Sequence, residues 1–414
     1  MERLLFFLKA ITVKGQAGRL SVLSAYILFL SGLINFAAAQ TPDSIPQKDL
    51  IDIGKSLFKI KPGPPSDNQQ KKIYFSLLPT TSSGHGSGSV FVTSTTAGFY
   101  LGDPKNTFLS TVTFAPYWNL RARFGLPLRS NIWLNNNLLT IQGDTRFLVY
   151  PQYTYGLNSR SPASDRVFLN SQYVRFYQSV LFRVKPYFFA GFGYNLDSHL
   201  DIETNTGTSI KTVTNYPYGT ATDLNSFSSG YNVSLLYDTR NNLLNPLPGG
   251  YVNIIYRDNT KFMGSNNSWQ SLYIDVRKYI SLSKENHQLF AFWTYYWTTL
   301  TTGTPYLDLP SIGWDPYNRS GRGIPQSRYR GRHLLYGEGE FRSNLTGNGL
   351  FGFVLFANIN SVAQPQNTKF VYFHPAEGFG LRIKFNKKSN TNIAADYAFS
   401  SGYHGLSLNL GEAF

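Results

Sequence analysis

The residue types that most often carry out chemistry in proteins are scarce in this chain. It has six histidines and no cysteine, so no thiolate nucleophile, disulfide or cysteine-bound metal is available. One tempting cluster is Asp197-Ser198-His199, which holds the three residue types of a serine hydrolase. Neighbours on an extended segment point to opposite faces, however, so closeness in sequence does not make this cluster a catalytic set. No other group of acids and histidines has metal-ligand spacing. We therefore predict no catalytic residue, no cofactor and no metal, and we do not expect an enzyme.

Charged residues recur instead at alternate positions of segments whose other positions are apolar. Glu338, Glu340 and Arg342 share one parity, while Arg382 and Asp396 lie on the polar parity of later segments. Alternation with period two is typical of a β-strand with one apolar and one polar face. The apolar rows include Phe351, Phe353, Leu355, Ala357 and Ile359, then Phe379, Leu381, Ile383 and Phe385, then Ile393, Ala395, Tyr397 and Phe399. One closed sheet in lipid accommodates both faces and satisfies its backbone groups, whereas a soluble sandwich needs a second layer. The pattern therefore favours a transmembrane β-barrel with a polar lumen.

The end of the sequence shows the same alternation. Leu406, Leu408, Leu410 and Phe414 share one parity, so we expect Phe414 to continue the apolar face of a closing strand. An aromatic residue at this place is what outer-membrane barrels present to their assembly machinery. We therefore predict that Gly411 and Phe414 form a C-terminal assembly signal, and that the barrel assembly machinery is a partner during biogenesis.

The first residues predict export. Basic residues precede an apolar stretch at 20–36, and three alanines follow at 37–39, as in a secretory signal peptide over residues 1–39. Residues 40–87 read as a periplasmic leader that contains a short amphipathic helix at 49–60, followed by prolines. This helix would lie either at the membrane interface or against the barrel mouth. Residues 88–414 would then form the barrel, and the protein would reside in the outer membrane of a Gram-negative bacterium.

Composition and length agree with an all-β membrane protein. Aromatic residues make up 16% of the chain and charged residues only 15%, against about 25% in ordinary soluble domains. No apolar run after residue 40 approaches the roughly 18 residues of a membrane helix. The net charge of +15 comes without a basic run, so we expect contact with outer-membrane lipid and lipopolysaccharide and not with nucleic acid. The length of 88–414 corresponds to about 16 antiparallel strands. Long outer loops are expected at 197–220 and 301–332, and a tight turn at 386–389.

Three segments carry a family resemblance. They are Tyr237-Asp-Thr-Arg-Asn-Asn-Leu-Leu-Asn-Pro-Leu-Pro-Gly-Gly-Tyr251, Gly321-Arg-Gly-Ile-Pro-Gln-Ser-Arg-Tyr-Arg-Gly331 with Tyr336-Gly-Glu-Gly-Glu-Phe-Arg342, and Gly378-Phe-Gly-Leu-Arg382. In this order they resemble the barrel domain of the bacterial surface-antigen family. That family includes the outer-membrane assembly factors BamA and TamA and the two-partner secretion transporters.

The resemblance implies a sixth outer loop that folds back into the lumen with an Arg-Gly dipeptide at its tip. Arg322-Gly323 matches this dipeptide, and the acids that share the luminal parity are Glu338 and Glu340. The family pattern in the following strand has an Asp where this chain has Asn358. Any contact there is expected to be a neutral hydrogen bond, which is weaker than one to an ionised group. We therefore predict a luminal loop lock made by Arg322, Gly323, Glu338, Glu340 and Asn358.

The sequence departs from the assembly factors at its N-terminal side. Residues 40–87 are too few to form the folded periplasmic POTRA modules that receive client proteins, so insertase activity does not transfer from the resemblance. The leading interpretation is a BamA/TamA-like barrel that acts in outer-membrane biogenesis or transport, with the infolded loop as a plug. The alternatives are a passive pore or structural barrel, and an outer-membrane lipid-modifying enzyme. The substrate, the conductance of the lumen and the oligomeric state are not predictable from these residues.

Overall fold

The computed structural model describes most of the chain after residue 45. It covers residues 46–59, 73–83, 89–118, 123–157, 159–205, 214, 216–218, 225–242, 244–283, 287–363, 368–387 and 389–414; at 73–83, 89–94 and 135 it describes the backbone. Residues 47–414 form one compact unit. The predicted signal peptide, residues 1–39, lies outside the described residues, as does much of the predicted leader.

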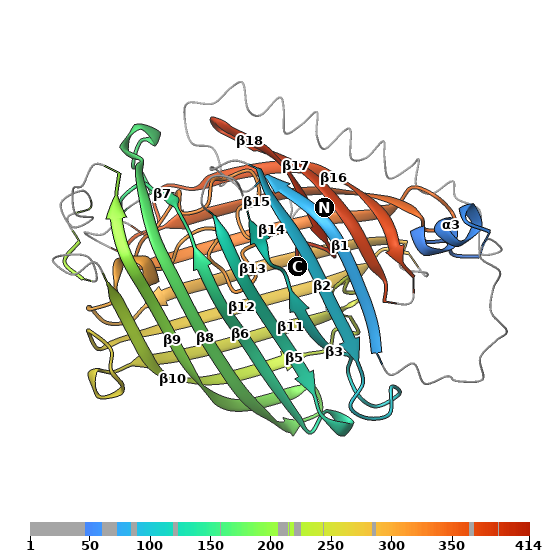
Figure 1. Ribbon diagram of the computed structural model, residues 1–414, viewed down its shortest axis with the longest axis horizontal. Coiled ribbons are helices and arrows are strands. Elements are labelled where there is room, and N and C mark those ends of the chain that lie inside the picture. Colours follow the sequence, from blue (N-terminus) through green and yellow to red (C-terminus); the bar gives the residue numbers. More distant parts are fainter. Residues whose placement is uncertain are drawn as a thin grey trace, which may run out of the picture. The chain divides into compact units, whose positions relative to one another are not determined.

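Alternating apolar and polar residues form one large sheet, shown in Figure 1. Eighteen strands lie in the described part of the chain: β1 Ile73–Ser83, β2 Ser89–Phe99, β3 Ser110–Phe114, β4 Tyr117–Trp118, β5 Phe124–Trp133, β6 Leu139–Val149, β7 Gln152–Thr154, β8 Val167–Lys185, β9 Phe188–Thr204, β10 Ser226–Asp238, β11 Gly249–Asn259, β12 Trp269–Ser281, β13 Gln288–Thr299, β14 His333–Asn344, β15 Phe351–Val362, β16 His374–Asn386, β17 Thr391–Ser400 and β18 Tyr403–Leu410.

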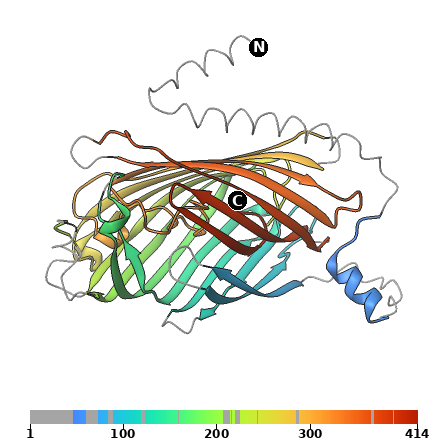
Figure 2. The same ribbon diagram turned by 90° about the horizontal axis from the view of Figure 1, so that it is seen from above.

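Neighbouring strands pair in chain order, and every ladder is antiparallel. Strands β3 and β4 both pair with β2 and with β5, so they are two parts of one interrupted strand. Strands β6 and β7 both pair with β8 and form a second interrupted strand. When each interrupted strand is counted once, the described part of the sheet has sixteen strands, which agrees with the expected number. Figure 2 shows the sheet curving around an interior, here called the lumen. Strands β1 and β18 lie beside each other, although no ladder between them is present among the described residues.

The predicted faces of the strands are confirmed where the structure describes their side chains. On β16, Phe379 and Leu381 are 52% and 59% exposed, whereas Arg382 between the apolar positions is 4% exposed. On β17, Tyr397 faces outward while Asp396 is buried. The outward rows are apolar and the inward rows carry the charges. This is the arrangement of a membrane barrel, in which strands alternate between lipid and lumen.

Two predicted boundaries need correction. The sheet begins at Ile73, so strand β1 lies inside the segment 40–87 that we had assigned to the leader. The loop predicted at 197–220 starts later, because β9 continues to Thr204. The first error arises because β1 contains Pro79 and ends in a run of Ser and Thr, and the second because the end of β9 carries Asp197, Asp201 and Glu203, which resemble a polar loop.

The predicted N-terminal helix is confirmed as α3, Leu50–Leu57, although none of its residues is buried. Asp49 caps it, because its carboxylate accepts the amide of Asp52 at 2.7 Å and that of Lys387 at 2.9 Å. The Lys387 ammonium reaches the Asp52 carboxylate at 2.6 Å and attaches the helix to the turn after β16. None of the helices in the described part of the chain has the length and apolar character needed to cross a membrane.

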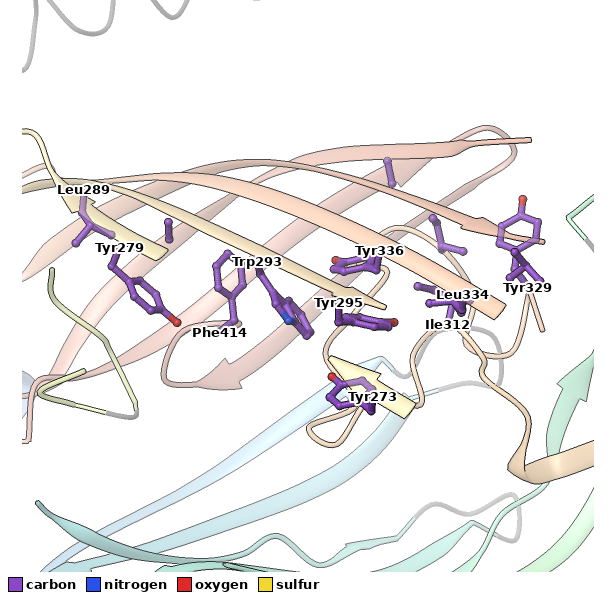
Figure 3. Packing of buried hydrophobic residues seen from close by; sticks show 14 residues of the cluster. Tyr273, Tyr279, Leu289, Trp293, Tyr295, Ile312, Tyr329, Leu334, Tyr336 and Phe414 are labelled. Carbon is purple, nitrogen blue, oxygen red and sulfur yellow. The ribbon is translucent and has the colours of Figure 1, made fainter. Parts of the chain in front are cut away.

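The expectation for Phe414 is wrong. Strand β18 ends at Leu410, and Gly411 adopts a φ of +83° that turns the chain inward. Phe414 is only 3% exposed and packs in the main aromatic cluster of the lumen, 5.3 Å from the ring of Trp293 and 6.3 Å from that of Tyr279 (Figure 3). Parity predicted an outward side chain because it assumed that the strand continues to its last residue.

Candidate functional site

The segment between β13 and β14, residues 300–332, is the most buried irregular part of the described chain. We call it the long loop. Its side chains contact the inward face of β14–β17 on one side and that of β5–β10 on the other. Ile324 from this loop joins the aromatic cluster of β12–β14, as does Ile312, which Figure 3 shows among the rings. A loop of this length has many conformations to lose, so these contacts must offset a large ordering entropy.

Arg322 lies at the tip of the loop among three carboxylates. Its Nε donates to Glu338 Oε1 at 2.8 Å and its Nη1 to Asp396 Oδ2 at 2.9 Å, while Nη2 contacts both Glu338 and Glu340. The guanidinium also stacks over the ring of Phe356 at 3.6 Å. Arg322 is 5% exposed, so these groups are shielded from water. A planar guanidinium presents its donors as a fork, which allows one side chain to hold several acids.

Two wall residues beside Arg322 bind the backbone of the loop by hydrogen bonds. Asn358 on β15 donates its side-chain amide to the carbonyl of Arg322 at 2.9 Å, and Ser400 on β17 donates to the carbonyl of Gly323 at 2.7 Å. Gly323 has a φ of +83°, and a Cβ at this position would lie 3.2 Å from the Cβ of Ala398. An L side chain would therefore meet both backbone strain and the wall of the barrel.

The structure thus places the five predicted lock residues together. Sequence reasoning missed three further members: Asp396, Phe356 and Ser400. Asp396 had been assigned to the lumen, but its place beside Arg322 depends on the register of β14 to β17, which sequence does not give. Asn358 makes the neutral hydrogen bond expected at its position, and because its acceptor is the backbone carbonyl of Arg322, the guanidinium is left to the acids.

Charges around the lock are paired in a chain along the wall. Glu340 also accepts from Arg342 at 2.7 Å, and Asp396 also accepts from Arg382 at 2.5 Å. Glu338 has no second arginine among the described residues, and its other partner is the hydroxyl of Tyr336. Arg322 is therefore the cation on which Glu338 depends. Buried charges remain ionised only when they are paired in this way.

The opposite wall holds the base of the loop. Arg146 on β6 donates to the carbonyl of Pro316 at 2.6 Å and to Asn318 at 2.8 Å. Asp308 accepts from Ser228 on β10 at 2.7 Å and lies 2.9 Å from His199 on β9. The long loop therefore bridges two walls of the barrel, and a single residue does not account for its position.

The cluster Asp197-Ser198-His199 is separated by this arrangement. Asp197 accepts from Tyr173, Tyr177 and Arg257, whereas His199 faces Asp308 of the loop. Asp197 and His199, two positions apart, share the luminal face and both contact Tyr173, whereas Ser198 has the opposite parity on this strand, so the three residues do not form one catalytic set.

A cavity of about 310 Å³ remains beside the loop, lined mainly by inward side chains of β3 to β12. Its lining mixes arginines, acids, amides and aromatic rings, among them Arg129, Asp144, Tyr177, Asn232, Arg257 and Trp314. The lumen is thus occupied on the β14–β17 side and hollow on the other side. The chemistry of this site is that of holding a segment inside a barrel by charge-assisted hydrogen bonds.

Comparison with known proteins supports the fold. The chain is similar to the crystal structure of BamA from Haemophilus ducreyi lacking POTRA domains 1–3, with 14% identity, a TM-score of 0.50, and coverage of 87% of this chain and 76% of that one. It is similar to CdiB from Acinetobacter baumannii, with 15% identity, a TM-score of 0.53, and coverage of 83% of this chain and 60% of that one. It is also similar to CdiB from Escherichia coli, with 8% identity, a TM-score of 0.55, and coverage of 82% and 62%.

No family model matches the chain, and no curated protein matches it. The chain spans about three fifths of the length of the two CdiB structures. The likeness is therefore one of fold: this protein has the antiparallel barrel fold of BamA and CdiB.

Proposed function

We propose that this protein is an outer-membrane β-barrel of the surface-antigen type, BamA- and TamA-like, which acts in outer-membrane biogenesis or transport with the long loop as a plug of its lumen. One observation carries the proposal: a loop of 33 residues, 300–332, is bound to both walls of the lumen, and its Arg322 faces three wall carboxylates. A barrel that serves only as a scaffold has no need to hold such a loop inside. A loop held by breakable polar contacts suits a lumen that opens and closes.

The location in a Gram-negative outer membrane, with lipid and lipopolysaccharide as neighbours, is part of this proposal. The apolar outward rows and the fold likeness support it. The barrel assembly machinery would insert the protein, and Gly411 with Phe414 remain our predicted assembly signal. The same residues have a second role inside the lumen, which is developed below.

A second candidate is a passive pore. The cavity of about 310 Å³ favours it, because this space lies within the lumen beside the loop. In this case the loop narrows the lumen without gating it.

The test is the release of the loop tip in Arg322→Ala. Because Glu338 loses its cation, the long loop should become sensitive to an added protease in vesicles, and single-channel conductance should become larger or noisier. The control is Arg183→Ala, whose guanidinium contacts the backbone of Asn136 at the sheet end. Wild-type protease resistance and conductance in the Arg322 variant would overturn the plug.

A further inference from the structure

Residues 411–414 leave the sheet and enter the lumen. Gly411 allows this turn, because its φ of +83° suits glycine and a Cβ there would lie 2.8 Å from the carbonyl oxygen of Leu244. Its amide donates to Asn392 at 2.8 Å, and the amide of Glu412 donates to Leu244 at 2.8 Å. We call residues 411–414 the inner segment.

The acidic residue of the inner segment has a specific site. The Glu412 carboxylate accepts from Arg382 at 2.7 Å and from the Asn392 side chain at 2.7 Å, and Glu412 is 2% exposed. Arg319 of the long loop contacts the carbonyl of Glu412 and lies 3.3 Å from that of Leu410. The segment is thus bound by the wall and by the loop together.

The aromatic residue also has a site of its own. The Phe414 ring lies against Trp293 and Tyr279, and its carbonyl oxygen accepts from Arg342 at 2.9 Å. Within the described residues, Tyr279 Oη, Trp293 Nε1, Arg342 Nη1 and Arg382 Nη2 are buried without a hydrogen-bond partner. These four atoms stay unpaired with the inner segment in place, so the recognition of this segment rests on the contacts that Arg382 and Asn392 make with Glu412 and that Trp293 and Arg342 make with Phe414.

The same contacts reach across one end of the lumen. Leu244 belongs to the turn between β10 and β11, whereas the inner segment follows β18. The same turn reaches the turn between β16 and β17, where Asn242 donates to the carbonyl of Ser389 at 2.7 Å. Strands β12 to β15 lie between these two turns in the ladder, so the contacts cross the mouth of the barrel.

We propose that the inner wall of β12–β17 is a peptide-binding site for a segment with a carboxylate two positions before an aromatic residue, and that the inner segment fills it in cis and closes this mouth. The carboxylate is bound by hydrogen bonds from Arg382 and Asn392. The aromatic ring packs against Tyr279, Trp293 and Arg342. Through Arg319, an occupied site also supports the long loop. This inference deepens the proposed plug by adding a second closure at the other end.

The experiment removes residues 412–414 and supplies them in trans. The variant is refolded from urea into detergent, so that insertion in the cell is not required, and its folding is checked by heat-modifiable migration. A fluorescent Gly-Glu-Ala-Phe peptide should then bind, as measured by anisotropy. Gly-Gln-Ala-Phe and Gly-Glu-Ala-Ala should bind about tenfold more weakly, the ratio expected for one charge-assisted hydrogen bond or one buried ring. The wild-type barrel should bind all three poorly, because its own segment fills the site.

Conductance gives the second measurement. The truncated barrel should conduct more than wild type, and Gly-Glu-Ala-Phe should restore the lower level. If the truncated barrel does not refold, the double variant Glu412→Gln, Phe414→Ala is used in its place. This variant keeps the backbone contacts of the inner segment and loses its carboxylate and its ring. Equal binding of the three peptides, or no binding, overturns the site. Failure of the peptide site can be distinguished from failure of the proposed plug. The plug is tested in the Arg322→Ala barrel, which keeps its inner segment, whereas the peptide site is tested by anisotropy, which does not depend on conductance.

Discussion

The dependence of Glu338 on Arg322 can be measured with a double-mutant cycle. In Arg322→Met, Glu340 keeps Arg342 and Asp396 keeps Arg382, but Glu338 keeps only the hydroxyl of Tyr336. Glu338 is fully buried, so an uncompensated charge remains, and we expect a loss of about 3–5 kcal/mol in the free energy of unfolding. Glu338→Gln in the same background removes that charge. The double variant should therefore be less destabilised than the sum of the single variants by about 1.5–3 kcal/mol.

Urea titration of the refolded barrel in detergent, followed by tryptophan fluorescence, gives these free energies if the m-values agree. The matched control combines Glu338→Gln with Arg146→Met. Arg146 holds the loop from the opposite wall and shares no partner with Glu338. That pair should be additive within about 0.5 kcal/mol. Additivity of the Arg322 pair as well would refute the idea that Arg322 neutralises Glu338.

Two further predictions concern the wall and the helix. Leu355→Lys on the lipid face should lower the free energy of unfolding by about 2–4 kcal/mol. Phe356→Lys should lower it at least as much, because Phe356 is 2% exposed and lies under Arg322. A milder effect of Phe356→Lys in folding titrations would contradict this luminal contact. The hydrogen bond from Lys387 holds the pKa of the Asp52 carboxyl below its usual value, so the attachment of α3 should persist above about pH 4 and weaken as the pH falls further. A nitroxide can be attached at Ser56→Cys, because the chain has no native cysteine. Its mobility should rise on acidification, and in Lys387→Met it should exceed that of the wild-type residue at neutral pH without rising further on acidification. Mobility that changes in neither case argues against this ion pair.

Most of the fold could be predicted, because period-two alternation is local. The rows on β15, β16 and β17 follow directly from which side chains suit lipid, and each strand reports its own faces. The start of the sheet was missed since β1 contains Pro79 and a run of Ser and Thr, which resemble a linker. The inward turn at Gly411 was missed for a different reason: a single residue with positive φ ends the alternation without changing the pattern of residue types.

The site was predictable only where the resemblance supplied a partner. Glu338 and Glu340 follow Arg322 closely enough for their shared parity to indicate one wall. Asp396 is separated from Arg322 by three strands, and its proximity depends on ladder register and on barrel curvature. Phe356 shows how parity can mislead: a residue on the luminal face need not be wet, since a loop can cover it. Parity alone would make lysine mild at this position, and the contact with Arg322 reverses that expectation.

The most direct measurement of the central proposal is single-channel conductance with and without the long loop. Residues 302–330 would be replaced by a short glycine linker in the refolded barrel, and folding verified by heat-modifiable migration. We expect the wild-type protein to be closed or to open briefly, and the loop-deleted protein to form a stable, larger channel, because the walls of β14–β17 then border open water. Equal conductance in the two folded proteins would show that the long loop does not plug the lumen.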